Sequence, residues 1–181
     1  PFYLNSNITL NKPNLNFLID KLLFSIVSLK PDLLGNLNGD VKLILTNIEH
    51  ELIRNGSINF NIRQKTINLT ELLFNIGDIG TIKTEIKYSE ENGDTIFSSS
   101  NSLSIKNKNQ FAKKFQLKLD KVKNINVINF KIEKNINSGL ISIFDIKINQ
   151  DINQDKNNSN SRYNIRNSQE LKSLVKNIIN S

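Results

Sequence analysis

Apolar residues return at every second position in several separate stretches of this chain. Polar residues such as Lys42, Asn59 and Glu85 occupy the positions between them. A period of two places successive side chains on opposite faces of a β-strand, so each stretch predicts a strand with one apolar and one polar face. The clearest runs are Val41, Leu43 and Leu45, then Ile58, Phe60 and Ile62, then Ile82, Ile86 and Tyr88.

The same pattern continues toward the C-terminus and predicts the fold class. Asn-Gly pairs at 38–39, 55–56 and 92–93 each precede an alternating run, and both residue types tolerate the positive φ of tight hairpin turns. We therefore predict a mainly β fold, a curled antiparallel meander sheet that is either an open groove or sandwich-like. The later strands are expected at residues 95–99, 103–105, 115–119, 128–132 and 140–148.

Two stretches have the period of an amphipathic helix. The first covers about residues 14–29, ends before Pro31, and is expected to pack on the sheet. The second covers residues 167–181, where Asn167 and Glu170 have the spacing of a capping box. Its stripe could pack on the same protein, dock on a partner or lie at a membrane surface. The stripe consists of Leu171, Leu174, Val175, Ile178 and Ile179, of which the first four are the candidate contacts for a partner or a membrane surface.

Composition changes divide the chain into segments. Apolar and polar residues alternate weakly over residues 2–10, which predicts an edge strand that ends before Pro13. Residues 150–166 are rich in Asn, Asp, Gln and Ser and have too few apolar residues to order themselves. We predict a β-rich groove domain over residues 1–149, a linker over 150–166 and an amphipathic helix over 167–181.

Composition also argues against several functions. The chain of 181 residues has a net charge of +7, but its Lys residues are spread along polar strand faces and its aromatic share is only 7% without Trp. Nucleic-acid binding needs clustered charge with stacking aromatics, so we predict no nucleic-acid partner. There is no Cys, and His50 is the only histidine, in a predicted exposed turn. Because the carboxylates are scattered and Ser98–Ser100 lack a nucleophile elbow, we predict no enzyme, no cofactor and no metal site.

The chain contains no Met and no apolar run of about 18 residues that could span a bilayer. We therefore expect it to be a fragment of a longer protein, with any anchoring segment upstream.

Several of these runs together resemble the C-terminal region of AsmA-like proteins of bacterial envelopes, over about residues 15–149. The runs that carry the resemblance are Leu34-Gly-Asn-Leu-Asn-Gly39, Leu52-Ile-Arg-Asn-Gly-Ser-Ile-Asn-Phe60, Phe74-Asn-Ile-Gly-Asp-Ile-Gly80 and Phe111-Ala-Lys-Lys-Phe-Gln116.

The resemblance implies a periplasmic β-groove, tethered to the inner membrane by an N-terminal helix outside this fragment. Its apolar face would shield or conduct phospholipid acyl chains between the inner and outer membranes, in support of outer-membrane biogenesis. Its partners would be the upstream part of the same chain and, through the C-terminal helix, other envelope proteins. The groove-lining role would fall on Val41, Leu43, Ile58, Phe60, Ile82, Ile86, Phe130 and Ile132.

Two other interpretations remain open from the residues. The alternating residues are equally compatible with the ordinary core of a β-sandwich module for assembly or adhesion, with no lipid cargo. An enzyme or sugar-binding jelly roll would need clustered aromatics and paired carboxylates, which the sequence does not contain.

Overall fold

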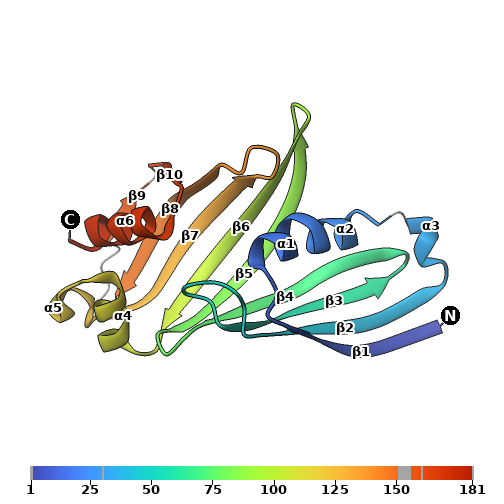
Figure 1. Ribbon diagram of the computed structural model, residues 1–181, viewed down its shortest axis with the longest axis horizontal. Coiled ribbons are helices and arrows are strands. Elements are labelled where there is room, and N and C mark those ends of the chain that lie inside the picture. Colours follow the sequence, from blue (N-terminus) through green and yellow to red (C-terminus); the bar gives the residue numbers. More distant parts are fainter. Residues whose placement is uncertain (1, 30, 151–155, 160, 181) are drawn as a thin grey trace. The chain divides into compact units, whose positions relative to one another are not determined.

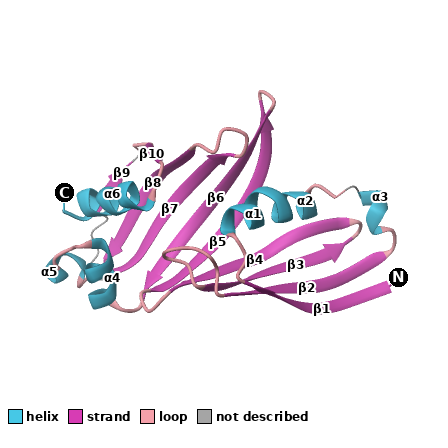
Figure 2. Ribbon diagram, in the orientation of Figure 1, coloured by secondary structure: helices cyan, strands magenta, loops and turns pink. Residues whose placement is uncertain are grey.

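The computed structural model describes residues 2–29, 31–150, 156–159 and 161–180 (Figure 1). The chain is mainly β, as predicted, with helices near the N-terminus and at the C-terminus (Figure 2). It divides into two compact units, Pro1–Ile76 and Gly77–Ser181, called unit 1 and unit 2 below. The division falls inside residues 1–149, which the sequence treats as one domain.

Unit 1 contains one sheet in the order β1-β2-β3-β4. Strands β2 (Leu37–Thr46), β3 (Asn55–Arg63) and β4 (Thr66–Ile76) form the predicted antiparallel meander. The predicted edge strand is present as β1 (Phe2–Asn11), but it runs parallel to β2. A parallel neighbour needs a crossover connection, and helices provide it here.

The helical crossover of unit 1 consists of α1 (Leu15–Phe17), η1 (Leu18–Leu23), α2 (Phe24–Val27) and α3 (Pro31–Leu34). The Asn14 side chain caps it by accepting a hydrogen bond from the Phe17 N–H at 3.0 Å. The middle turn, η1, is wound as a π-helix. Helix α2 contacts β4, so it covers part of the sheet. As predicted, the helix ends before Pro31, since α2 ends at Val27. Pro31 then begins the separate helix α3, because proline is tolerated at a first helical position.

Unit 2 contains a second meander. Its long strands are β5 (Gly80–Glu91), β6 (Asp94–Ile105), β7 (Ile125–Asn135) and β8 (Ile141–Gln150), all antiparallel. Within the predicted linker, residues 151–155 and 160 lie outside the described residues. The described remainder is not structureless, since β9 (Lys156–Ser159) and β10 (Tyr163–Ile165) both pair with β8.

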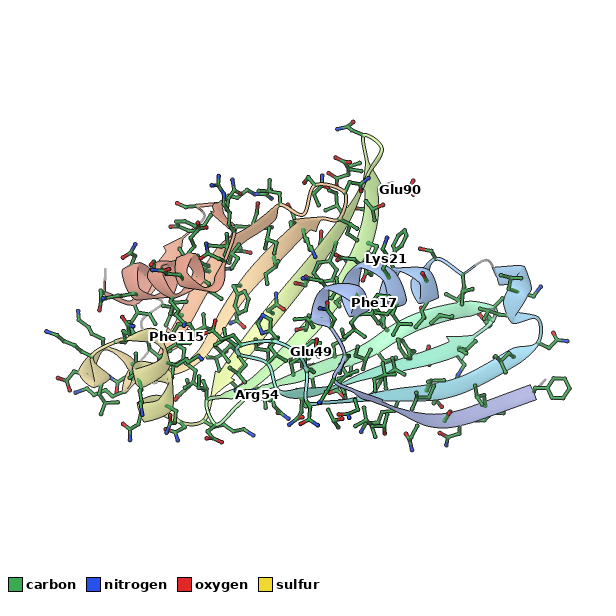
Figure 3. All side chains as sticks on the ribbon, viewed as in Figure 1. Phe17, Lys21, Glu49, Arg54, Glu90 and Phe115 are labelled. Carbon is green, nitrogen blue, oxygen red and sulfur yellow. The ribbon has the colours of Figure 1, made fainter. Side chains whose placement is uncertain are left out.

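Three helices complete unit 2: α4 (Lys108–Phe115), α5 (Leu119–Val122) and α6 (Ser168–Asn180). The strand predicted over residues 115–119 is therefore wrong. Phe111 and Phe115 lie four residues apart on α4, with ring centroids 4.9 Å apart, and both are buried (Phe115 is labelled in Figure 3). The four-residue spacing of the two phenylalanines is typical of a helix, and the short alternation of apolar and polar residues that follows it does not form a strand.

Two of the three predicted Asn-Gly turns are wrong. Only Asn92-Gly93 forms a hairpin turn, with φ of 52° and 84°. Gly39 lies inside β2, where an added Cβ would be 2.3 Å from the Leu4 carbonyl oxygen. Gly56 lies in β3, where it would be 2.6 Å from the Phe74 ring. These two glycines are needed for close approach of neighbouring strands, a role that sequence alone does not separate from turn formation.

Candidate functional site

Four of the predicted groove-lining residues share one face of the unit 1 sheet. Val41 pairs with Phe60 and Leu43 pairs with Ile58 across β2 and β3. Leu43, Ile58 and Phe60 are buried and Val41 is half-buried. These four residues therefore belong to the packed core of unit 1, and of the four only Val41 is partly exposed to solvent.

The other four predicted residues share one face of the unit 2 sheet. Ile86 and Ile132 flank Ser99 of β6, and Phe130 lies opposite Asn101. Ile82 pairs with Leu103 farther along the same face. All four predicted residues are half-buried.

A buried row of polar side chains interrupts this face of unit 2. Thr84, Ser99 and Asn101 are each less than one-tenth exposed. The Thr84 hydroxyl donates to Asn101 Oδ1 at 3.0 Å, and Asn101 Nδ2 donates to Ser99 Oγ at 3.0 Å and to the Ser99 carbonyl at 3.3 Å. Buried polar atoms are tolerated when they are paired in this way. The sequence interpretation missed this row, because the alternation of β6 places serine and asparagine where apolar residues were expected.

The apolar face of unit 1 continues into solvent on β1. Phe2, Leu4 and Ile8, called the edge strip below, are 81%, 41% and 44% exposed. Ile8 is in register with Leu43 and Leu4 with Gly39, so the edge strip lies on the same face as the core of unit 1. No described strand pairs with the outer edge of β1. Exposed apolar side chains also occur nearby in the chain, at Phe17 of α1 (Figure 3), Leu29 and Leu33.

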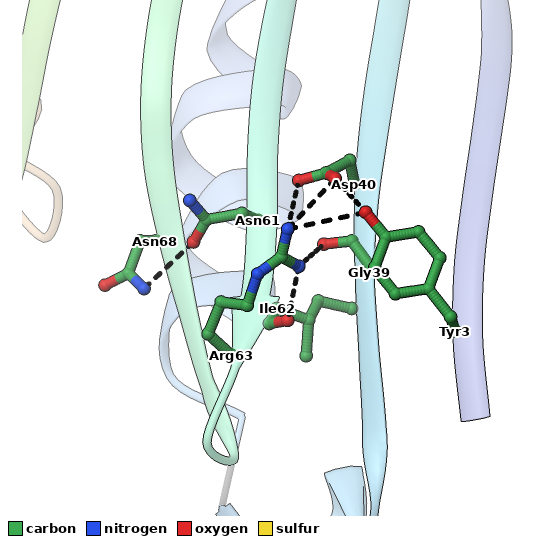
Figure 4. A network of polar contacts seen from close by, with 7 residues as sticks. All are labelled: Tyr3, Gly39, Asp40, Asn61, Ile62, Arg63 and Asn68. Carbon is green, nitrogen blue, oxygen red and sulfur yellow. Dashed lines mark hydrogen bonds and ion pairs between the residues drawn. The ribbon is translucent and has the colours of Figure 1, made fainter. Parts of the chain in front are cut away.

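On the opposite face of unit 1, a polar network joins three strands (Figure 4). Arg63 donates to both carboxylate oxygens of Asp40 at 3.0 Å and to the carbonyl oxygen of Gly39 at 2.7 Å. The Tyr3 hydroxyl donates to Asp40, and the Arg63 guanidinium lies 5.5 Å from the centroid of the Tyr3 ring. The hydrogen bonds from Tyr3 and Arg63 lower the pKa of the Asp40 carboxyl. The network therefore attaches β1 to β2 and β3 by its polar face.

The polar face of unit 2 is a mixed and internally paired surface. Ser98, Ser100, Ser102 and Ser104 form a row along β6. Ser98 and Ser100 help to line a depression together with Lys87, Lys131 and Phe144. Two of the basic side chains near it are paired. Lys131 pairs with Asp145 at 2.8 Å, Arg162 pairs with Glu133, and the Arg162 guanidinium lies 4.6 Å from the Phe144 ring centroid.

His50 has a structural role in the loop after β2. Its Nδ1 accepts hydrogen bonds from the N–H groups of Leu52 and Ile53, both at 3.2 Å. Burial lowers the pKa of the imidazole, and the Glu51 carboxylate opposes this effect. The neutral imidazole with an accepting Nδ1 fits this hydrogen-bonding pattern.

The C-terminal stripe packs within unit 2. Helix α6 contacts α4, α5 and β10. Leu174 and Ile178 are buried, whereas Leu171 and Val175 are half-buried. Of the three alternatives that the sequence leaves open, the structure therefore shows packing on the same protein. As predicted, Asn167 caps the helix, since its Oδ1 accepts from the N–H groups of Gln169 and Glu170.

Among the described residues, no helix has the length and apolar character needed to cross a bilayer.

Comparison of the chain with protein-family models, with curated proteins and with solved structures finds no match. The resemblance to AsmA-like proteins therefore stays a prediction.

Proposed function

We propose that this protein is a non-enzymatic module that shields an apolar chain, such as a phospholipid acyl chain, on the exposed apolar face of unit 1. The single observation that carries the proposal is the edge strip. Phe2, Leu4 and Ile8 extend the core face of a sheet into solvent instead of ending it with polar residues. Ser6 lies between Leu4 and Ile8 on this face, and exposed apolar surface that exceeds scattered single residues is typical of interaction sites.

The physics of the site is apolar transfer. Burial of each methylene group contributes about 0.8 kcal/mol, and the strip from Phe2 to Ile8 extends over about 20 Å of strand. An acyl chain lying along β1 would cover the side chains of the strip and lose much of its own contact with water. No nucleophile, metal or general base is required for this action.

The AsmA-like resemblance supports the same proposal and adds a location. In that setting the module would act in the periplasm, tethered to the inner membrane, and would carry phospholipid between the inner and outer membranes. The exposed apolar side chains on this face of unit 1 lie on β1, whereas all eight residues predicted to line a groove are buried or half-buried. The proposed contact residues are therefore Phe2, Leu4 and Ile8.

The test compares lipid binding by two matched double variants. Leu4→Asn with Ile8→Asn makes two of the three edge-strip positions polar, and these positions are 41% and 44% exposed, so unit 1 keeps its core. Leu119→Asn with Leu140→Asn is the control, because both leucines lie in unit 2 and are 48% exposed.

Each protein would be expressed in a bacterial envelope, purified without detergent and examined by native mass spectrometry followed by lipid extraction. We expect near-stoichiometric phospholipid with the wild type and the control, and at least a tenfold loss with the edge-strip variant. Titration with neutral and with anionic phospholipid separates apolar transfer from attraction to the +7 net charge. A folded, lipid-free wild type, or equal binding by both double variants, would overturn the proposal.

The second candidate function is a structural assembly module without lipid cargo. The observation that favours it is the outer edge of β1, whose backbone groups are available for pairing with another strand. A lipid-free protein that nevertheless associates through β1 would support this candidate over the first.

A further inference from the structure

The backbone of β1 has a bonded side and an open side. The Phe2 N–H donates to the Asn36 carbonyl, and the Lys12 N–H donates to the Thr46 carbonyl, so even-numbered residues form the ladder to β2. The N–H and C=O groups of consecutive strand residues point to opposite sides. The backbone groups of Tyr3, Asn5, Asn7 and Thr9 therefore point outward, away from β2.

β1 has none of the features that normally prevent edge pairing. Edge strands are usually protected by charged side chains, Pro, a bulge or shortness. β1 has ten residues, no Pro and an uninterrupted register with β2. It is also the only described strand of nine or more residues without Asp, Glu, Lys or Arg. In a chain of net charge +7, an uncharged edge is the place where two copies repel each other least.

The β8 edge of the unit 2 sheet is covered, unlike the outer edge of β1. In unit 2, β8 is paired with the short strands β9 and β10, and α6 contacts β10. This end offers no long open edge among the described residues. A head-to-tail chain of copies through β1 and β8 would need a long open edge on β8, so a closed pair through β1 alone is favoured over it.

The sequence of β1 is self-complementary in an antiparallel pair. With Ser6 opposite Ser6 of a second copy, Leu4 lies opposite Ile8 and Phe2 lies opposite Leu10. These even-numbered residues form the non-hydrogen-bonded pairs, in which side chains approach most closely. The outward groups of Asn5 then bond with those of Asn7, and those of Tyr3 with Thr9. Because the two-fold axis is perpendicular to the sheet, both edge strips lie on the same face.

We propose that the outer edge of β1 pairs antiparallel with β1 of a second copy of this chain, with the two-fold axis at Ser6, to form a symmetric dimer with a continuous sheet. The pairing brings the two edge strips together on one face, on either side of the central pair of Ser6 residues. The inference does not depend on lipid as the cargo.

The first experiment uses single cysteines, since the chain has no Cys of its own. Ser6→Cys places two thiols in a non-hydrogen-bonded pair, whose Cα separation of about 4.5 Å is within the range of a disulfide. Ser100→Cys is the control, because Ser100 is an exposed strand residue of unit 2. Under mild oxidation at low protein concentration, we expect Ser6→Cys to form a covalent dimer at least tenfold faster than Ser100→Cys. Equal rates for the two variants would overturn the proposal.

The second experiment removes one outward N–H. Asn7→Pro leaves intact the bonds that the even-numbered residues of β1 make to β2, because Pro is tolerated at edge positions whose N–H faces solvent. Sedimentation velocity should show a concentration-dependent dimer for the wild type and a monomer for Asn7→Pro, with unchanged circular dichroism. A wild type that stays monomeric at all concentrations, or an Asn7→Pro variant that dimerises like the wild type, would refute the pairing.

The two proposals fail separately. Asn7→Pro keeps the side chains of the edge strip, so lipid binding by a monomeric wild type would refute the dimer and leave the proposed function standing. A wild type that dimerises without bound lipid, and that becomes monomeric on Asn7→Pro, would support the dimer and refute the proposed function.

Discussion

Tyr3 on β1 donates its hydroxyl hydrogen to the carboxylate of Asp40 on β2, which Arg63 of β3 also holds at 3.0 Å. These hydrogen bonds lower the pKa of Asp40 in the folded protein, with that from Tyr3 as the largest cause. A carboxyl whose pKa is depressed on folding stabilises the fold above its unfolded pKa, about 3.9, and loses this effect as the pH falls through the folded pKa.

We therefore expect Asp40→Asn to be less stable than the wild type at pH 7 and to approach it as the pH falls below about 4. Urea unfolding at a series of pH values measures the difference. Tyr3→Phe removes the hydroxyl alone and should show the same trend with a smaller amplitude. A difference between Asp40→Asn and the wild type that stays constant from pH 7 to pH 3 would contradict this assignment.

The turn between β3 and β4 is built from unfavourable residues. Gln64 and Lys65 have φ of 50° and 60°, values that residues with a Cβ rarely adopt. Asn-Gly is the preferred pair for such a two-residue hairpin. We expect Gln64→Asn with Lys65→Gly to raise the free energy of unfolding by about 1 kcal/mol.

The reverse exchange at the other hairpin is the matched control for this turn. Asn92→Gln with Gly93→Lys, at φ of 52° and 84°, should lower stability by about 1 kcal/mol or more. Urea unfolding measures the change in the free energy of unfolding for both double variants. Changes of the same sign would contradict the assignment of strain to the turn at Gln64 and Lys65.

Removing one polar side chain of the buried row in unit 2 should lower the stability of the protein more than removing all three. Asn101→Ala leaves the hydroxyls of Thr84 and Ser99 buried without their partner, so we expect a loss of about 1–3 kcal/mol. The triple variant Thr84→Val, Ser99→Ala, Asn101→Leu removes all three polar groups and should be close to neutral, because no orphaned group remains. A triple variant that loses the sum of the three single effects would argue against the row as a coupled network.

The N-terminus of α6 offers a test with a control in the same helix. Asn167 accepts two backbone hydrogen bonds, and Glu170 Oε2 accepts from the Arg166 N–H at 2.8 Å. We expect Asn167→Ala to cost about 1 kcal/mol, whereas Asn167→Asp keeps the cap. Asn177→Ala, at an exposed position inside α6, should instead be neutral or slightly stabilising, because Ala is the better helix former. Thermal unfolding monitored by circular dichroism compares the three variants.

Periodicity predicted the elements better than their connections. The alternation around Leu43, Ile58 and Ile86 identified three strands, and the spacing of Leu171 and Leu174 identified α6, because burial of one face leaves a direct trace in the sequence. The parallel direction of β1 left no such trace. It follows from a helical crossover, and the same residues would alternate equally well in an antiparallel strand.

The candidate site was harder to predict, because accessibility depends on tertiary packing. Leu43 and Ile8 are both apolar strand residues in register with each other, yet the first is buried and the second is 44% exposed. The difference in their exposure arises because Ile8 lies on the edge strand β1, whereas Leu43 lies on β2 inside the sheet. Likewise, Gly39 resembled a turn glycine, whereas its absent side chain makes room for the Leu4 carbonyl.

The polar row at Thr84, Asn101 and Ser99 also bears on how the meander of unit 2 selects its alignment. A strand that slides by two residues keeps its apolar side chains inward, so alternation alone does not reject that misalignment. Sliding β6 by two positions against β5 would place Asn101 opposite Ile82 or Ile86 and separate its amide from the Thr84 hydroxyl. The buried amide would then lack a partner, at a cost of about 1–3 kcal/mol. The row thus discriminates between alignments that the hydrophobic pattern treats as equivalent.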